Sequence, residues 1–98
     1  MHQITVPNEL VDNYKKMSRL LASEKVDIID IQMRAGEMIP THNAREDAVV
    51  IVRKGELFFN VEGMDHRLKD SDIVVLEPLE NHSLEAITDV ELIVLKIQ

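Results

Sequence analysis

The stretch "GEMIPTHNAREDAVVIVRKGE", from Gly36 to Glu56, decides how the rest of the chain is interpreted. It places a glycine, a proline, a lone histidine and two adjacent acids ahead of the apolar run "AVVIV", and a second glycine follows that run. Glycine accepts backbone geometry that is closed to other residues, and a proline at position 40 favours an extended Ile39. These signals predict a β-strand between two turns, with a histidine that is a candidate metal ligand.

The remainder of the chain from Lys25 onward also predicts strands. The segment "KVDIIDIQM" alternates, with Ile29, Ile31 and Met33 on one face and polar residues on the other. The segments "DAVVIVRK", "DIVVL" and "VELIVLKI" are apolar on both faces, as expected for strands that are covered on both sides. Short strands separated by turn signals about every 8 to 12 residues predict an all-β sandwich or barrel.

The first 24 residues are ambiguous. Leu10, Tyr14, Met17 and Leu21 follow helical spacing, and Asn8 is a suitable N-cap, but "MSRLLAS" also suits a strand. We expect a short helical or loop segment near residues 8–14, followed by a strand near residues 17–23. The chain is then one domain over residues 1–98, with an N-terminal extension of about 1–16 and a barrel of about 17–98.

Composition excludes several classes of function. The chain has 98 residues, 45% of them apolar, and no cysteine, which rules out disulfides and thiol catalysis. The net charge of −7 opposes binding to nucleic acid or to an anionic membrane surface. No apolar run approaches the roughly 20 residues that span a bilayer, and the N-terminus lacks the pattern of a secretory signal. We therefore expect a cytoplasmic protein.

The spacing of the opening stretch resembles the first motif of the cupin family, usually written G-x5-H-x-H-x3-E-x6-G. Gly36, His42 and Gly55 match its glycines and first histidine at the right spacing. Ala44 stands where the second histidine belongs, and Ala48 stands where the glutamate belongs. The resemblance implies a small single-domain cupin, a double-stranded β-helix or jelly-roll barrel, with an incomplete metal-binding motif.

A second cupin motif, usually G-D-x4-P-x-G-x2-H, is matched in part by "SDIVVLEPLENH". Asp72 and His82 match, whereas Ser71, Glu77 and Leu79 replace the two glycines and the proline. The following "HSLEA" is also typical of cupins. The resemblance extends from about residue 17 to residue 98.

The resemblance implies a metal site of four ligands, of which only His42 and His82 are present, facing each other across the barrel. Cupin sites hold Fe, Mn, Zn, Ni or Cu. Inward residues recur at every second position of a strand, so Glu46 shares the parity of His42 and is a weak candidate for a third ligand. A bulge near "NARED" would be needed to bring it to the right level. No metal is therefore assigned to the chain.

The predicted ligand-binding pocket combines two histidines and a carboxylate with an apolar lining. Its residues are His42, His82, Glu46, Met33, Val50, Leu57, Phe59 and Leu84. A core filled by these side chains is the alternative, although Ala44 and Ala48 leave room for a cavity. Four acids are expected near the mouth and should raise the pKa values of the histidines. They are Glu37, Glu46, Glu77 and Glu80.

Three functions fit this pattern. The first is a cupin that binds a small molecule without an obligatory metal. The second is a metal-dependent oxygenase or isomerase that uses His42, His82 and Glu46. The third is a structural or regulatory dimer with a filled barrel. The family resemblance implies a homodimer in all three, and no feature of the sequence names a substrate.

Overall fold

The computed structural model describes residues 1–98, and every regular element in it is a β-strand. The nine strands are β1 (Lys15–Ala22), β2 (Val26–Met33), β3 (Met38–His42), β4 (Asp47–Lys54), β5 (Leu57–Val61), β6 (Met64–Leu68), β7 (Ile73–Leu76), β8 (His82–Ala86) and β9 (Val90–Ile97). The all-β class predicted from the alternating and two-sided apolar segments is confirmed.

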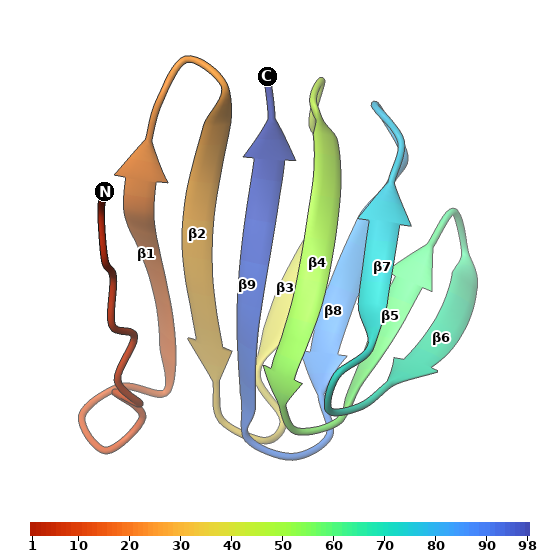
Figure 1. The fold of residues 1–98 in the computed structure, drawn as a ribbon. Helices are drawn as coiled ribbons and strands as arrows, with labels where there is room; N and C mark the ends of the chain where they lie inside the picture. The colour runs from red at the N-terminus through yellow and green to blue at the C-terminus, as the bar shows by residue number, and fades with distance from the viewer.

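Two antiparallel sheets face each other, and Figure 1 shows them as a front and a back layer. The large sheet has the order β1-β2-β9-β4-β7, and the small sheet has the order β3-β8-β5-β6. The last strand, β9, lies between β2 and β4, so strands far apart in sequence are neighbours in the large sheet. This is the jelly-roll arrangement that the resemblance to the cupin motifs implied.

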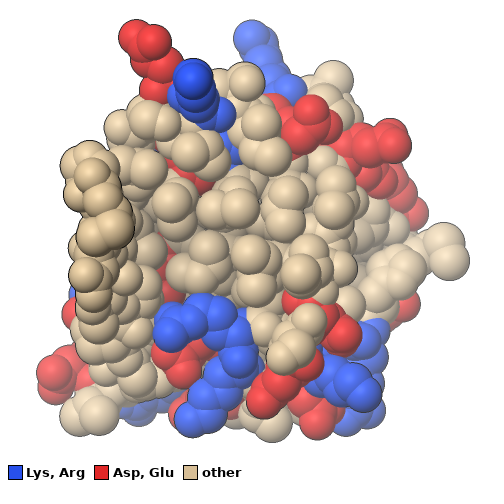
Figure 2. All heavy atoms as spheres, viewed as in Figure 1, with Lys and Arg blue, Asp and Glu red and all other residues tan.

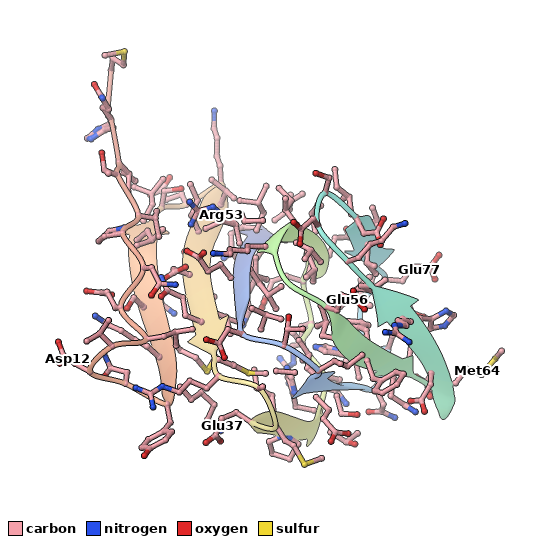
Figure 3. The ribbon with its side chains drawn as sticks, turned by 90° about the horizontal axis from the view of Figure 1, so that it is seen from below. Asp12, Glu37, Arg53, Glu56, Met64 and Glu77 are labelled. Carbon is pink, nitrogen blue, oxygen red and sulfur yellow. The ribbon has the colours of Figure 1, made fainter.

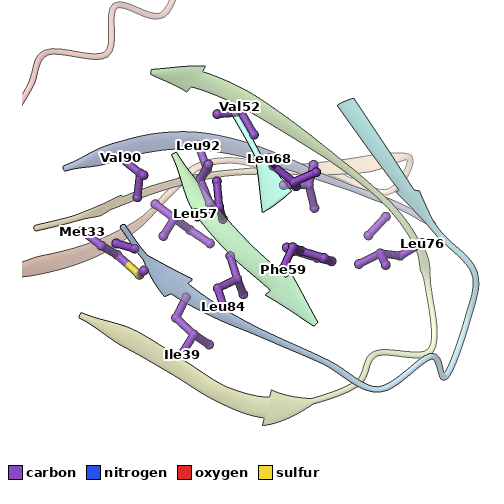
Figure 4. Packing of buried hydrophobic residues seen from close by; sticks show 14 residues of the cluster. Met33, Ile39, Val52, Leu57, Phe59, Leu68, Leu76, Leu84, Val90 and Leu92 are labelled. Carbon is purple, nitrogen blue, oxygen red and sulfur yellow. The ribbon is translucent and has the colours of Figure 1, made fainter. Parts of the chain in front are cut away.

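The core lies between the sheets, because each strand turns one apolar face inward. Fourteen buried residues form one hydrophobic cluster, and Met33, Leu57 and Phe59 are among its largest fully buried side chains. Figure 4 shows these side chains packed between the facing strands. Burying each such side chain contributes roughly 1.5 to 3 kcal/mol, so this cluster is the main source of stability.

The N-terminal segment is a loop, and the helix allowed for near residues 8–14 is not formed. Asn8 Oδ1 accepts a hydrogen bond from the backbone N–H of Leu10 at 3.0 Å, which closes a turn where a helix would have begun. β1 starts at Lys15, two positions before the strand expected from the sequence. The apolar residues at helical spacing therefore belong to a turn and a strand.

Gln32 on β2 attaches this segment to the outer face of the large sheet. Its Oε1 accepts from the backbone N–H of Glu9 at 2.8 Å, and its Nε2 donates to the carbonyl of Pro7 at 2.9 Å. Gln32 also donates to Asp30, and both side chains are almost completely buried. Burial raises the pKa of Asp30. The extension therefore covers polar residues on the outside of the sheet and leaves the inside free.

The rest of that outer face is largely uncharged. Figure 2 shows uncharged atoms across its middle, with charged groups gathered toward its edges. Arg53 lies on this face, as Figure 3 shows, and its guanidinium is 3.7 Å from the carboxylate of Glu91. On the lower part of this face, Lys and Arg groups lie among Asp and Glu groups in Figure 2. No helix in the structure is long and apolar enough to cross a membrane.

Candidate binding site

His42 and His82 lie next to each other on neighbouring strands of the small sheet. β3 and β8 pair in antiparallel fashion, and the two histidines are direct cross-strand partners. Their ring centroids are 4.1 Å apart, with an angle of 63° between the planes. The two histidines were expected to face each other across the barrel, whereas they lie side by side in the small sheet. The pair marks what we call the open end of the barrel, where β3 and β9 end and β8 begins.

An irregularity in β3 turns His42 toward the cavity. Ile39 pairs with Leu84 and His42 pairs with His82, so three steps along β3 match two along β8. Pro40, which has no N–H to contribute to the ladder, lies inside this shift. As a result Ile39 and His42 both line the inside of the barrel. The bulge that Glu46 would need lies near "NARED", after His42, whereas this shift precedes His42.

Backbone carbonyls fix the tautomers of both rings. His42 Nδ1 lies 2.9 Å from the carbonyl oxygen of Pro40, and His82 Nδ1 lies 3.0 Å from that of Glu80. A carbonyl oxygen only accepts, so each Nδ1 carries the proton and donates it. In the neutral ring, Nε2 then has a free lone pair. The pair therefore offers two hydrogen-bond acceptors at one place.

The ring of His82 also stacks on Phe59, with centroids 5.8 Å apart and an interplanar angle of 9°. Burial lowers the pKa of His82, and the positive charges of His42 and Lys96 act in the same direction. The carbonyl and the carboxylate of Glu80 oppose this shift but do not outweigh it. The expectation that acids near the mouth raise the histidine pKa values is wrong for His82, because desolvation is the larger effect.

A cavity of about 90 Å³ lies between the sheets at the open end. Eleven of its 14 lining residues are hydrophobic. The lining consists of Met17, Ile29, Ile31, Ile39, His42, Ala44, Ala48, Val50, Phe59, Leu76, His82, Leu84, Val94 and Lys96. The space exceeds the roughly 15 Å³ that one water needs, and it is smaller than the roughly 150 Å³ cavity known to hold benzene. It suits a short apolar chain.

Five of the eight pocket residues predicted from the sequence line this cavity: His42, His82, Val50, Phe59 and Leu84. Met33 and Leu57 do not, because they are fully buried nearer the opposite end of the barrel. Glu46 is also absent from the lining. It lies in the loop between β3 and β4, where the alternation of a strand no longer determines which way a side chain points.

Lys96 is a charged residue of the cavity lining that was not predicted from the sequence. It lies near the end of β9 and lines the cavity with Val94. The segment was interpreted as apolar on both faces, yet Val90, Leu92, Val94 and Lys96 share one parity. Continuing the alternation by one step would have predicted an inward lysine at the open end.

The donor set does not fit a resident divalent metal. Protein metal sites of this kind use at least three protein donors, and only two imidazoles are available here. No group of three His, Cys, Asp or Glu residues lies close enough to hold a metal ion. Ala44 and Ala48 line the cavity without donor atoms, and Lys96 adds a positive charge to the same space.

Solved structures with the same architecture include several described as cupins. An RmlC-like cupin from Desulfovibrio desulfuricans matches 99% of this chain and 94% of its own, with a TM-score of 0.85 and 20% identity. An RmlC-like cupin from Methanocaldococcus jannaschii, described as a double-stranded β-helix, matches 99% and 92%, with a TM-score of 0.82 and 25% identity.

A third similar structure is a variant of salicylate 1,2-dioxygenase from Pseudoaminobacter salicylatoxidans in complex with gentisate. It matches 86% of this chain and 25% of its own, with a TM-score of 0.81 and 20% identity. No protein-family model matches the chain, and no curated sequence does. The strand order, the histidine positions and these similarities together show that the chain has the cupin fold, the double-stranded β-helix.

Proposed function

We propose that this protein binds a small organic molecule in the cavity at the open end, without a resident metal. The observation that carries the proposal is an apolar cavity in which two histidine side chains present free Nε2 acceptors. Apolar walls with a few convergent polar groups are the usual composition of a ligand site.

The volume of the cavity and the hydrogen-bonding groups of its lining indicate which ligands would fit. The volume of about 90 Å³ encloses a chain of a few carbon atoms, and any larger part must extend through the mouth. The lowered pKa of His82 favours its neutral ring at neutral pH, and the neutral ring accepts at Nε2. A hydroxyl or amide N–H on the ligand satisfies this acceptor. The complex of the similar dioxygenase with gentisate supports the proposal at the level of the fold alone.

A titration with pentan-1-ol, followed by backbone amide NMR, tests the proposal. This probe combines a short apolar chain with one hydrogen-bond donor. We expect saturable shifts at residues of β3, β8 and the end of β9, which surround the cavity. Pentane, which lacks the hydroxyl, should bind more weakly. Shifts that do not saturate, or that are confined to the outer face of the large sheet, would contradict the proposal.

The alternative function is a metal-dependent oxygenase or isomerase. Metal analysis of the purified protein distinguishes it from a metal-free binding protein. Its support is the orientation of His42 and His82, because metal-binding imidazoles commonly donate their other N–H to a carbonyl. Its weakness is the missing third donor, since Glu46 does not line the cavity. We expect tag-free protein to contain only trace metal. Stoichiometric metal that disappears in His42→Ala would favour the alternative.

The third candidate, a dimer with a filled barrel, is less well supported because the barrel contains a cavity. The homodimer itself is a separate prediction. Light scattering on the purified protein checks it, and twice the mass of the chain is the expected result. The cytoplasmic location likewise stays a prediction from the sequence.

A further inference from the structure

Lys96 is placed so that its side chain meets the cavity from the large sheet. Its cross-strand partner on one side is Ala48, whose small side chain leaves space beside it. Its partner on the other side is Asp27 of β2. Lys96 is only partly exposed, and it lines the cavity that the two histidines line from the small sheet.

The ammonium group of Lys96 makes no ion pair and no hydrogen bond within the protein. Its cross-strand partner Asp27 has its carboxylate 3.8 Å from the guanidinium of Arg19 and does not form an ion pair with Lys96. The residue is partly buried, and a lysine can cover its apolar stem while its ammonium group stays available to a ligand. The side chain therefore retains its capacity to bind an anion.

The other charges near the open end leave this capacity in place. The carboxylate of Glu80 lies near His82, but one of its oxygens accepts from the backbone N–H of Glu77 at 2.7 Å. The net charge of the whole chain is −7, which repels anions at long range. Salt screens such interactions beyond about 8 Å at physiological ionic strength, so the local positive charge decides binding inside the cavity.

We infer that the ligand of this cavity is a small hydroxy acid, with a carboxylate that binds Lys96 and a hydroxyl that donates to a histidine Nε2. The inference rests on the proposed small-molecule function and narrows it to one chemical class. One cation and two imidazole rings at an apolar cavity are complementary to one anion, one hydrogen-bonding group and a short hydrocarbon chain. A neutral alcohol fills only part of this site, and an alkylammonium ion is repelled by Lys96.

The test compares 2-hydroxypentanoate with 2-hydroxypentanamide, which share the chain and the hydroxyl and differ in charge. Binding is measured by NMR titration at neutral pH. The wild-type protein should bind the acid about tenfold or more tightly than the amide, which is typical of a charge-assisted hydrogen bond. Lys96→Gln should weaken binding of the acid by about the same factor and leave binding of the amide unchanged.

Two further variants control for charge and for folding. Lys25→Gln removes one positive charge from an exposed turn and should leave the preference intact. Lys96→Arg keeps the charge and should retain most of the preference, provided that its thermal transition matches that of the wild type. If pentan-1-ol binds but the wild-type protein binds the acid and the amide equally well, the inference is overturned and the proposed function stands. Failure of all three probes would overturn the proposed function as well.

Discussion

The two ends of the barrel are built by the same strands but are filled differently. The end opposite the histidines, which we call the packed end, is closed by Met33, Val52, Leu57, Val90 and Leu92, all with no exposed area. Figure 4 shows Met33, Val90, Leu57 and Leu92 gathered together, with Phe59 and Leu76 further along the barrel. The open end instead has alanines, histidines and a lysine around a cavity.

We infer from this difference that the packed end supplies stability and that the open end supplies the proposed binding site. At the packed end every inward side chain is apolar and contacts others. At the open end small residues at positions 44 and 48 leave space, and His42, His82 and Lys96 line it. Substitutions at the packed end should therefore change the free energy of unfolding, whereas substitutions at the open end should change ligand binding.

The largest effect is expected for Leu57→Ala at the packed end. Leu57 is fully buried, so the change removes apolar contacts and leaves a cavity that costs about 2 to 5 kcal/mol. Chemical denaturation measures this loss. Val75→Ala on the exposed outer face is the control and should stay within about 0.5 kcal/mol. Equal losses of unfolding free energy in Leu57→Ala and Val75→Ala would contradict the view that the packed end supplies the stability.

Gly55→Ala should be nearly as destabilising, again at the packed end. Gly55 has φ of +95°, and an added Cβ would lie 2.1 Å from the carbonyl oxygen of Asp89. Gly63 has a similar φ of +85° but open space around it, so Gly63→Ala bears only the backbone strain of about 1 to 2 kcal/mol. Gly55→Ala should lose roughly 1 to 3 kcal/mol more than this control in urea denaturation. Identical losses would mean that the contact with Asp89 relaxes freely.

Ala48→Leu at the open end should abolish binding with little effect on stability. The larger side chain occupies the cavity, and filling a cavity changes the free energy of unfolding by about 1 kcal/mol or less. Pentan-1-ol should bind this variant at least about tenfold more weakly than wild type, as NMR titration measures. Undiminished binding would show that the alcohol does not occupy this space.

The smallest effect concerns pH and His82. Burial lowers the folded-state pKa of His82 below the ordinary value of 6.5, so the unfolded chain binds its proton more readily. Stability should therefore decrease as pH falls below about 6.5, and it should be fully present above that pH. His82→Gln should show a shallower decrease between about pH 7 and 5.5 in denaturation experiments. An unchanged or steeper slope would contradict the lowered pKa.

The fold was predictable because it depends on features that are local in sequence. The spacing of Gly36, His42 and Gly55 and the alternation in each strand specify turns and inward faces directly. The N-terminal helix was a wrong alternative because the spacing of Leu10 and Tyr14 could not reveal the turn made by Asn8.

The site was predictable only in part. The motif positions identified His42 and His82. Glu46 was included because it shares the strand parity of His42, but β3 ends at residue 42, so that parity does not extend to it. Lys96 was missed because the end of β9 becomes part of the site only when β9 inserts between β2 and β4. The alternation along β9 predicts that Lys96 points inward, but the cavity that it lines depends on long-range pairing, which leaves no local signal.

The central claim, that the open end is a ligand site, is tested most directly by a crystal structure of the protein with pentan-1-ol. We predict density for the carbon chain between Ala48 and Leu84, with the hydroxyl oxygen within hydrogen-bonding distance of Nε2 of His42 or His82. A cavity that contains only water, or that has collapsed around the histidines, would contradict the account.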